Sequence, residues 1–515
     1  MRGDLSQLLI DTDVWTDEMV GEAGIPVIDV PLVSVGSGIG SFVLFDRLRI
    51  YGVPATAMAV LGPQDVPWGS YEYLTRVSQI PRQERLRSDS TGNPDNLWGF
   101  PSYALREAVA EKTLRPLWNV LVEPVFANYY TPRAGQVFTA MEREYHRVDY
   151  ARSLYKGHVR MVRKRHGGGY FTILTPPERA TATKRIAFRS NYVHIAVGYP
   201  GLRLLPDLQE YREKYRDPTR VVNAYEPHEH VYQALQRRPG TVMVRGGGIV
   251  ASRVLQRLID DRDRLRLNTQ ILHLFRTYVA GPHGPSIFMR RKGGHGWAYQ
   301  GFNWPKGTWG GQYKQRLRKL EGRERAEFLN IMGGTNTPIR KNWREQLQRG
   351  RTQGWYQIMV GTVRELVPDR TRPGVLTTVL PDNHAPLPFP QPDRPTDVHA
   401  DYIIDCTGLE ADIREHRLLA DLLDHTGAGR NPLGRLDVDR TFELIGTRSG
   451  TGRIYAAGSA TLGGYYAGVD TFLGLQYAAL EIADDLAAQG FCPRFGPLRS
   501  LRQWRLWVMN KKIGS

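Results

Sequence analysis

Three glycines, Gly36, Gly38 and Gly40, alternate with other residues after a short apolar run and before an amphipathic stretch. In a unit of this kind the first glycine allows a tight turn, the second lets a pyrophosphate approach the backbone, and the third permits close packing of a helix. The free N–H groups at the start of that helix then face the phosphates. We therefore expect Gly36, Ser37, Gly38, Gly40 and Ser41 to contact a dinucleotide.

The stretch around these glycines, residues 30–61, has the pattern of a complete folding unit. Its apolar periodicity predicts a strand, the glycine turn, a helix and a second strand, in that order. The pattern departs from the usual one because no acidic residue occupies positions 61–64, where an acid would hold a ribose hydroxyl. Either Asp65 folds back toward the ribose, or Gln64 or a backbone group replaces the acid.

A second glycine turn follows a short apolar strand at residues 242–244. It has the form G-x-G-x-x-A, in which Gly246, Gly248 and Ala251 are the matching residues. Two units of strand, glycine turn, helix and strand in one chain are far more specific than either alone. We expect this second turn to bind another dinucleotide.

The strand after the second turn, residues 271–275, ends on a base instead of an acid. Arg276 at that position suits a ribose 2′-phosphate, because a guanidinium donates charge-assisted hydrogen bonds to phosphate. Arg253, just inside the helix after the turn, could approach the same phosphate. The alternative interpretation is that both arginines only solvate the surface.

Two further strands, expected at residues 401–405 and 453–457, end in small residues, and an apolar helix is expected at residues 468–479. The N-terminus of that helix could face the polar edge of a flavin ring. Thr407, Gly408, Gly458, Ser459 and Asp470 lie at the expected ends of these strands and at the start of this helix.

The composition limits the class of protein. At 515 residues the chain can form a large core and two or more domains, so stability needs no metal or disulfide. Lys and Arg exceed Asp and Glu by 69 − 52 = 17, but the surplus is scattered, which favours local phosphate sites over nucleic-acid binding. Cys406 and Cys492 lie far apart and form no C-x-x-C motif. No run of 18 apolar residues and no signal peptide is present, so we expect a cytoplasmic soluble protein.

Together these segments resemble the flavoproteins with two dinucleotide-binding domains, the group that contains pyridine-nucleotide oxidoreductases and class B flavin monooxygenases. The resemblance covers roughly residues 30–485. It implies an α/β fold with two Rossmann-like domains, the second inserted into the first. It also implies FAD at the first glycine turn and a nicotinamide cofactor, NADPH given Arg276, at the second. Cys406-Thr407-Gly408 matches the Ala-Thr-Gly turn of the family, whereas Ser459 replaces the aspartate of its Gly-Asp segment. With these matches we assign cofactor contacts to Thr407, Gly408, Gly458, Ser459 and Asp470.

The domain boundaries implied by this resemblance divide the chain into four parts. Residues 25–220 form the first part of the FAD-binding domain, and residues 221–395 form the NAD(P)H-binding domain with inserted loops. Residues 396–490 form the second part of the FAD-binding domain. Residues 491–515 are a basic tail, which could lie on an anionic membrane surface or dock against the protein itself.

The monooxygenases of this group carry a signature, F-x-G-x-x-x-H-x-x-x-W/Y, shortly before the second glycine turn. Residues 222–232 occupy that place and keep only its last two elements, His228 and Tyr232, and chance explains the match about as well. His228 and His230 could equally be ordinary surface histidines, because H-x-H alone is too little for a metal site.

The function that we infer is an NADPH-dependent FAD oxidoreductase. Monooxygenation of a small organic metabolite is the leading outcome, and reduction or dehydrogenation without oxygen insertion is the second. The third is a flavin electron-transfer protein that docks an acidic protein or a membrane. The sequence predicts no catalytic residue, substrate identity or oligomeric state.

Overall fold

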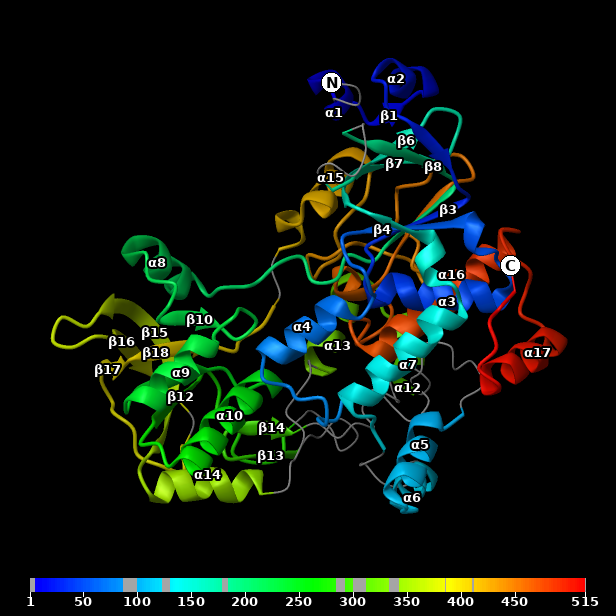
Figure 1. The fold of residues 1–515 in the computed structure, drawn as a ribbon. Coiled ribbons are helices and arrows are strands. Elements are labelled where there is room, and N and C mark those ends of the chain that lie inside the picture. The colour runs from blue at the N-terminus through cyan, green and yellow to red at the C-terminus, as the bar shows by residue number, and fades with distance from the viewer. Residues whose placement is uncertain are drawn as a thin grey trace.

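A computed structural model describes residues 5–86, 100–122, 130–177, 184–283, 292–299, 312–332, 342–384, 386–409 and 412–514. Two large sheets with helices around them organise the described chain, one in the upper and one in the lower left part of Figure 1. Both have a core of parallel strands, so the predicted α/β class is confirmed.

The first large sheet has five parallel strands in the order β19-β9-β3-β4-β5. Their side chains are buried at nearly every position of β3 and β4, as expected for a parallel sheet covered on both faces. The strands are β3 (Leu32–Val35), β4 (Met58–Gly62), β5 (Leu154–Lys156), β9 (Tyr192–Ile195) and β19 (Arg453–Ala456).

Helix α3 (Ile39–Tyr51) follows β3 and is the central helix of this unit. It is buried on nearly all sides, because α16 (Phe472–Ala488) and α7 (Ala134–Arg147) pack against it in addition to the sheet. Residues 30–61 therefore form the predicted strand, glycine turn, helix and strand.

The second large sheet has seven strands in the order β10-β18-β11-β12-β15-β16-β17, of which the last two pairings are antiparallel. The strands are β10 (Val221–Asn223), β11 (Thr241–Arg245), β12 (Gln270–Phe275), β15 (Tyr356–Pro368), β16 (Val375–Pro381), β17 (Thr396–Ala400) and β18 (Tyr402–Asp405). The helices around it are α8 (Pro206–Tyr215), α9 (Glu229–Arg237), α10 (Ile249–Leu265) and α14 (Trp343–Thr352). The expected boundary at residue 396 thus falls inside this sheet, which continues through Asp405.

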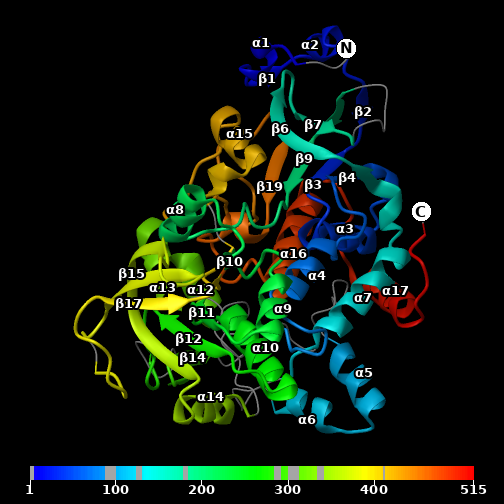
Figure 2. The same ribbon diagram turned by 60° about the vertical axis from the view of Figure 1, so that its left-hand side comes forward.

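A smaller sheet, β1-β6-β7-β8-β2, joins the N-terminal residues to the first unit at the top of Figure 2. Its strands are β1 (Val14–Trp15), β2 (Val27–Asp29), β6 (His158–Arg165), β7 (Tyr170–Thr175) and β8 (Ile186–Ser190), next to α1 (Gln7–Ile10) and α2 (Asp17–Glu22). The fully buried guanidinium of Arg163 binds Asp421 of α15 (Arg417–His425) at 2.8 Å and so holds this sheet to the body.

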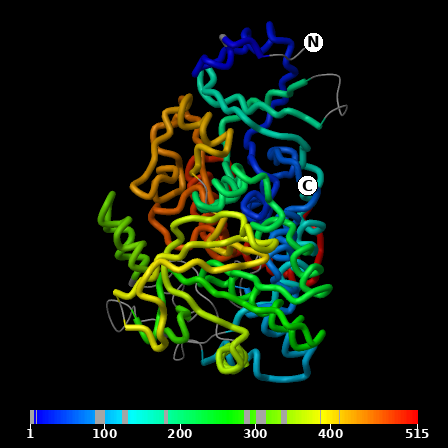
Figure 3. Tube along the Cα trace, turned by 90° about the vertical axis from the view of Figure 1, so that its left-hand side faces the viewer, coloured from blue at the N-terminus to red at the C-terminus, as the bar shows by residue number. Residues whose placement is uncertain are grey.

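The remaining elements are short. They are the helices α4 (Gly69–Val77), α5 (Ser102–Glu111), α6 (Arg115–Leu121), α12 (Gln312–Lys319) and α13 (Gly322–Met332), the strands β13 (Lys292–Gly294) and β14 (Trp297–Tyr299), and the 3-10 helices η1 (Ala55–Ala57), η2 (Tyr150–Ser153), η4 (Ile413–Glu415) and η5 (Gly458–Thr461). The tube in Figure 3 shows the chain of the second sheet, green to yellow, in front of the first unit.

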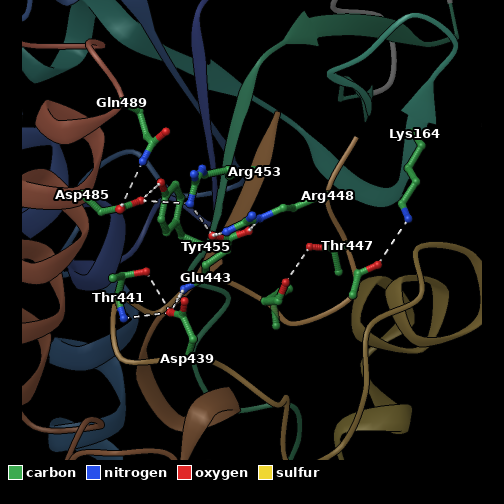
Figure 4. A network of polar contacts seen from close by, with 12 residues as sticks. Lys164, Asp439, Thr441, Glu443, Thr447, Arg448, Arg453, Tyr455, Asp485 and Gln489 are labelled. Carbon is green, nitrogen blue, oxygen red and sulfur yellow. Dashed lines mark hydrogen bonds and ion pairs between the residues drawn. The ribbon is translucent and has the colours of Figure 1, made fainter. Parts of the chain in front are cut away.

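A polar network anchors β19 to α16 (Figure 4). The buried carboxylate of Glu443 accepts hydrogen bonds from Arg448 and Arg453, and the Tyr455 hydroxyl donates to Asp485 at 2.5 Å. Because these contacts fix both the strand and the helix, they also fix the small-residue segment after β19.

The basic tail forms helix α17 (Pro497–Val508), which docks against the protein. Trp507 is buried and contacts Phe100 and Arg143, while the guanidinium of Arg49 donates to the carbonyls of Ile513 and Gly514 at 3.2 Å. Of the two alternatives for the tail, docking against the protein itself is therefore observed for this face of the helix. Across the described part of the chain, no helix is long and apolar enough to cross a membrane.

Candidate functional site

The first glycine turn connects β3 to α3, and each of its glycines has a distinct geometry. Gly36 has φ +100°, and a Cβ there would lie 2.2 Å from the carbonyl oxygen of Ala196, so no other residue fits. A Cβ on Gly38, the N-cap of α3, would meet no protein atom within 4 Å. A Cβ on Gly40 would lie 3.0 Å from the Cβ of Ala196, so the helix packs closely there. The open space at Gly38 leaves room for a ligand beside the helix N-terminus.

A cavity of about 540 Å³ lies directly in front of this turn. Segments far apart in the chain converge on it, because the carboxyl ends of parallel strands meet at one edge of a sheet. The predicted site residues that line it are Gly36, Ser37, Gly38, Gly40, Gly458, Ser459 and Asp470. The structure therefore brings the first glycine turn together with the exit of β19 and the start of α16.

Several lining residues carry no recognisable signal in the sequence and were not predicted. They come from α4, from the ends of β4, β5 and β9, and from the segments that follow β10 and β18, and include Tyr71, Leu74, Gly157, Tyr225, Leu409 and His416. Single residues of this kind, whether in a helix such as α4 or in loops, have no spacing that would mark them as ligand contacts.

The end of β4 shows where the nearest acid points. Asp65 forms an ion pair with Lys156, and its side chain is 77% exposed, whereas Gln64 lines the cavity. The backbone N–H of Gln64 donates to Ser37 Oγ at 3.0 Å. The side-chain oxygen Gln64 Oε1 is buried and has no hydrogen-bond partner among the described residues. A buried acceptor without a partner is costly, so a hydroxyl donor from a ligand fits this position.

Ser41 lies behind the turn and does not line the cavity. Its hydroxyl is 2.8 Å from that of Ser34, which is also 2.8 Å from Nδ1 of His194 on the neighbouring strand β9. Burial lowers the pKa of His194 to about 3, so the imidazole is neutral at pH 7. These three side chains brace α3 against the sheet.

The exit of β19 and the start of α16 form the far wall of the cavity. Ser459 Oγ donates to the carbonyl of Gly198 at 2.7 Å, which joins the exits of β19 and β9. The Tyr199 hydroxyl donates to Asp470 at 3.0 Å. Asp470 precedes the N-cap Thr471 of α16, so a carboxylate stands at the positive end of this helix dipole.

The second glycine turn connects β11 to α10 and repeats the geometry of the first. Gly246 has φ +117°, and a Cβ there would lie 2.9 Å from the carbonyl oxygen of Cys406. Gly248 is the N-cap of α10, and a Cβ there would meet no protein atom within 4 Å. Ala251 is fully buried in the core between helix and sheet.

A buried histidine holds the second turn from below. His273 Nε2 lies 2.7 Å from the carbonyl oxygen of Gly246, and Nδ1 lies 2.7 Å from the Tyr356 hydroxyl. Burial lowers the pKa of His273 to about 4, so the ring is neutral at pH 7. Because a carbonyl can only accept, Nε2 carries the proton and Nδ1 accepts from Tyr356.

The two arginines assigned to the 2′-phosphate differ in their surroundings. Arg276 directly follows β12, is exposed, and forms no hydrogen bond or ion pair with a described residue. Arg253 is mostly buried and binds Glu84 at 2.8 Å, and its Nε donates to the carbonyl of Gln79 at 3.2 Å. Arg253 thus links α10 to the segment after α4.

Thr407 and Gly408 follow β18, the strand beside β11, and so lie next to the second glycine turn. The N–H and hydroxyl of Thr407 both donate to Asp405 Oδ1, at 3.0 and 2.7 Å, and Gly408 has φ +137°. The following residue, Leu409, lines the cavity at the first turn. This segment therefore runs between the two turns.

The interpretation of His228 as a surface histidine is wrong. His228 is buried, its Nδ1 is 2.7 Å from the carbonyl of Glu226, and its Nε2 is 3.1 Å from the Tyr232 hydroxyl. Both elements of the signature kept by the chain are therefore in contact. His230, in contrast, is exposed, as expected.

No protein-family model and no curated protein matches the sequence. Solved structures do match. The ornithine hydroxylase of Pseudomonas aeruginosa has 16% identity, a TM-score of 0.61, and coverage of 90% of this chain and 100% of its own. The cadaverine monooxygenase of Erwinia amylovora, which was solved with FAD bound, has 12% identity, a TM-score of 0.63, and coverage of 91% and 96%.

The L-lysine 6-monooxygenase of Pseudomonas syringae is a third match, at 12% identity, a TM-score of 0.59, and coverage of 89% of this chain and 99% of its own. At such identities the likeness establishes the fold. The resemblance inferred from the motifs is thus confirmed at the level of the fold, which the chain shares with these monooxygenase structures.

Proposed function

We propose that this protein is an FAD- and NADPH-dependent monooxygenase that hydroxylates the terminal amine of a small organic metabolite. The observation that carries the proposal is the cavity at the first glycine turn. This cavity lies in a fold that about nine tenths of the chain shares with ornithine, cadaverine and lysine monooxygenases. Primary aliphatic amines are the substrates that these neighbours share.

The residues around the first turn fit FAD. The backbone amides at the N-terminus of α3 would bind the pyrophosphate beside Gly38. Gln64 Oε1 would accept a hydrogen bond from a ribose hydroxyl, which is the role of the usual acid. Ser459 and Asp470 would border the remainder of the cofactor on the far wall. When bound, FAD would supply the group that accepts a hydride from NADPH and then reacts with oxygen.

The residues around the second turn fit NADPH. Gly246 and Gly248 would hold the pyrophosphate, with Ala251 packed behind them and Thr407 and Gly408 alongside. Arg276 is the better candidate for the 2′-phosphate, because its guanidinium is exposed whereas that of Arg253 is bound to Glu84.

The domain organisation that we propose has the NADPH-binding unit inserted into the FAD-binding unit. The chain leaves the five-stranded sheet after β9 and contributes to it again at β19, and the seven-stranded sheet is formed by residues in between. The FAD-binding unit starts near residue 25, the NADPH-binding unit near residue 221, and the tail at residue 491. The return to the FAD-binding unit follows β18, later than residue 396.

The test is made on the purified full-length protein. An absorption spectrum with flavin bands, oxygen uptake driven by NADPH, and a hydroxylamine product from ornithine, lysine or cadaverine would support the proposal. NADPH oxidation coupled to an added electron acceptor without hydroxylated product would favour the reductase alternative. A folded protein that neither contains nor binds flavin would contradict both.

A further inference from the structure

We propose that the outer face of helix α17 docks the protein on an anionic lipid bilayer. One face of this helix is already used, because Gln503 and Trp507 are buried against the body of the protein. The opposite face is exposed, and its apolar residues with their exposed fractions are Leu498 (86%), Leu501 (65%), Val508 (53%), Met509 (42%) and, at its border, Trp504 (37%).

The spacing of these residues makes a stripe that one cation, Arg505, interrupts. At 3.6 residues per turn, Leu498, Leu501 and Val508 lie within about a quarter-turn of one another along the helix surface. Burying a leucine side chain stabilises by several times the thermal energy. Helix α17 lies on the rim of the molecule, at the right of Figure 1. Exposed apolar side chains gathered on one face often mark an interaction site.

The charges around the stripe select the kind of partner. Residues 491–515 contain no Asp or Glu, and their basic residues are Arg494, Arg499, Arg502, Arg505, Lys511 and Lys512. Arg502 and Arg505 are exposed on the same face as the leucines. Apolar residues that penetrate the acyl boundary, flanked by cations that pair with headgroups, form the pattern of an interfacial helix.

Self-association fits the same surface less well. In a two-fold dimer through α17, the exposed arginines of one copy would face those of the other with no acid of residues 491–515 between them. The repulsion would oppose the gain from burying the leucines. An anionic bilayer offers both an apolar layer and negative charge.

The contacts between the docked face of α17 and the body of the protein would persist when the outer face binds a bilayer. Arg143 stacks on Trp507 and binds its carbonyl, and Arg499 binds the carbonyl of Tyr51. The helix is thus a fixed projection of the unit that we assign to FAD, and membrane docking would hold the whole protein at the surface without unfolding the tail.

Flotation of the full-length protein with liposomes tests the proposal. Wild-type protein should float with vesicles of phosphatidylcholine and phosphatidylglycerol and remain at the bottom with phosphatidylcholine alone. The variant Arg502→Gln/Arg505→Gln should partition roughly thirtyfold more weakly, since each basic residue near an anionic leaflet contributes about 1 kcal/mol. The variant Leu498→Ser/Leu501→Ser/Val508→Ser should lose binding by a factor on the order of a hundred or more.

The matched control is Leu114→Ser/Leu121→Ser at helix α6, which removes two leucines that are as exposed as those of α17. It should float like the wild type, and thermal melts should show that all variants are folded. Equal flotation of wild type and both α17 variants would overturn the proposal. So would a concentration-dependent dimer that the α17 variants abolish, or binding that the α6 control loses.

Discussion

The two glycine turns use the same backbone device but differ in what surrounds them. In each, a glycine with positive φ turns the chain against a neighbouring strand, and a second glycine opens the helix N-terminus to a ligand. Each also has a buried neutral histidine nearby, His194 or His273. The first turn faces a cavity walled by several segments, whereas the arginine beside the second is exposed to solvent.

The difference follows the tasks that we propose for the two sites. A cofactor that stays bound through many cycles profits from an enclosed site, because burial increases its contacts and slows its release. A nucleotide that enters and leaves in every cycle needs an open approach, and an exposed charge such as Arg276 can attract its phosphate. The same local motif thus gives two sites with different exchange behaviour.

The largest effects are expected when the same side chain is added to both turns, which tests whether each turn binds a different cofactor. Gly38→Val should bind flavin at least about a hundredfold more weakly, because the added methyl groups occupy the space where a pyrophosphate would approach. Gly248→Val should keep its flavin and lose affinity for NADPH. Both glycines have extended backbone conformations, and a Cβ on either meets no protein atom within 4 Å, so both variants should fold.

Flavin content from the absorption spectrum and NADPH affinity from titration would measure the two effects. If both variants lost flavin equally, or if neither did, the assignment of one cofactor to each turn would be wrong.

Arg276→Ala should sharpen the comparison at the second turn. A charge-assisted hydrogen bond contributes about 1.5–3 kcal/mol, so NADPH should bind roughly tenfold to a hundredfold more weakly while NADH changes little. Arg253→Ala is the control, because that guanidinium is bound to Glu84, and its loss should lower thermal stability without changing the ratio of NADPH to NADH. Steady-state kinetics with both nucleotides would decide, and a wild type that prefers NADH would refute the assignment.

The buried histidines predict a pH dependence shared by both units. Their pKa values of about 3 for His194 and about 4 for His273 lie below the ordinary 6.5, so the unfolded chain takes up protons first as the pH falls. Stability from these groups is complete above pH 6.5 and is lost as the pH falls toward 4 and then 3. Each histidine contributes a slope of about 1.4 kcal/mol per pH unit in that window.

Urea unfolding between pH 6.5 and 4.5 would measure this slope in the wild type and in His273→Gln. The variant should have the shallower slope, because it lacks one of the buried histidines whose pKa is lowered. Equal slopes would show that His273 is not held neutral in the folded protein.

The smallest effect is expected for Ser41→Ala. The hydroxyl lies behind the first turn and bonds to Ser34, so the variant should lose about 1 kcal/mol of unfolding free energy and retain wild-type flavin content. Chemical denaturation and the flavin spectrum of the same sample would check this. Loss of flavin from a stable variant would place Ser41 in the binding site after all.

Local patterns in the sequence were sufficient for the strand, glycine turn, helix and strand of both units, because each element is set by periodicity over a few neighbouring residues. The surroundings of Ser41 could not be predicted in this way, because its hydroxyl contacts Ser34, which in turn contacts His194 on another strand. The ion pair between Arg253 and Glu84 joins residues that are 169 positions apart, so no local sequence pattern predicts it. The same holds for Tyr225 and His416 in the cavity wall.

Arg49 shows what such distant contacts mean for synthesis of the chain. Its guanidinium also donates to the carbonyls of Val53 and Val148, and it meets Ile513 at a separation of 464 positions. While the ribosome is still translating the second sheet, this cation has only part of its set of acceptors. The core around α3 therefore reaches its final form only after residues 513 and 514 have emerged, so the folding of the first unit is completed last although four of its five strands are made before the second sheet.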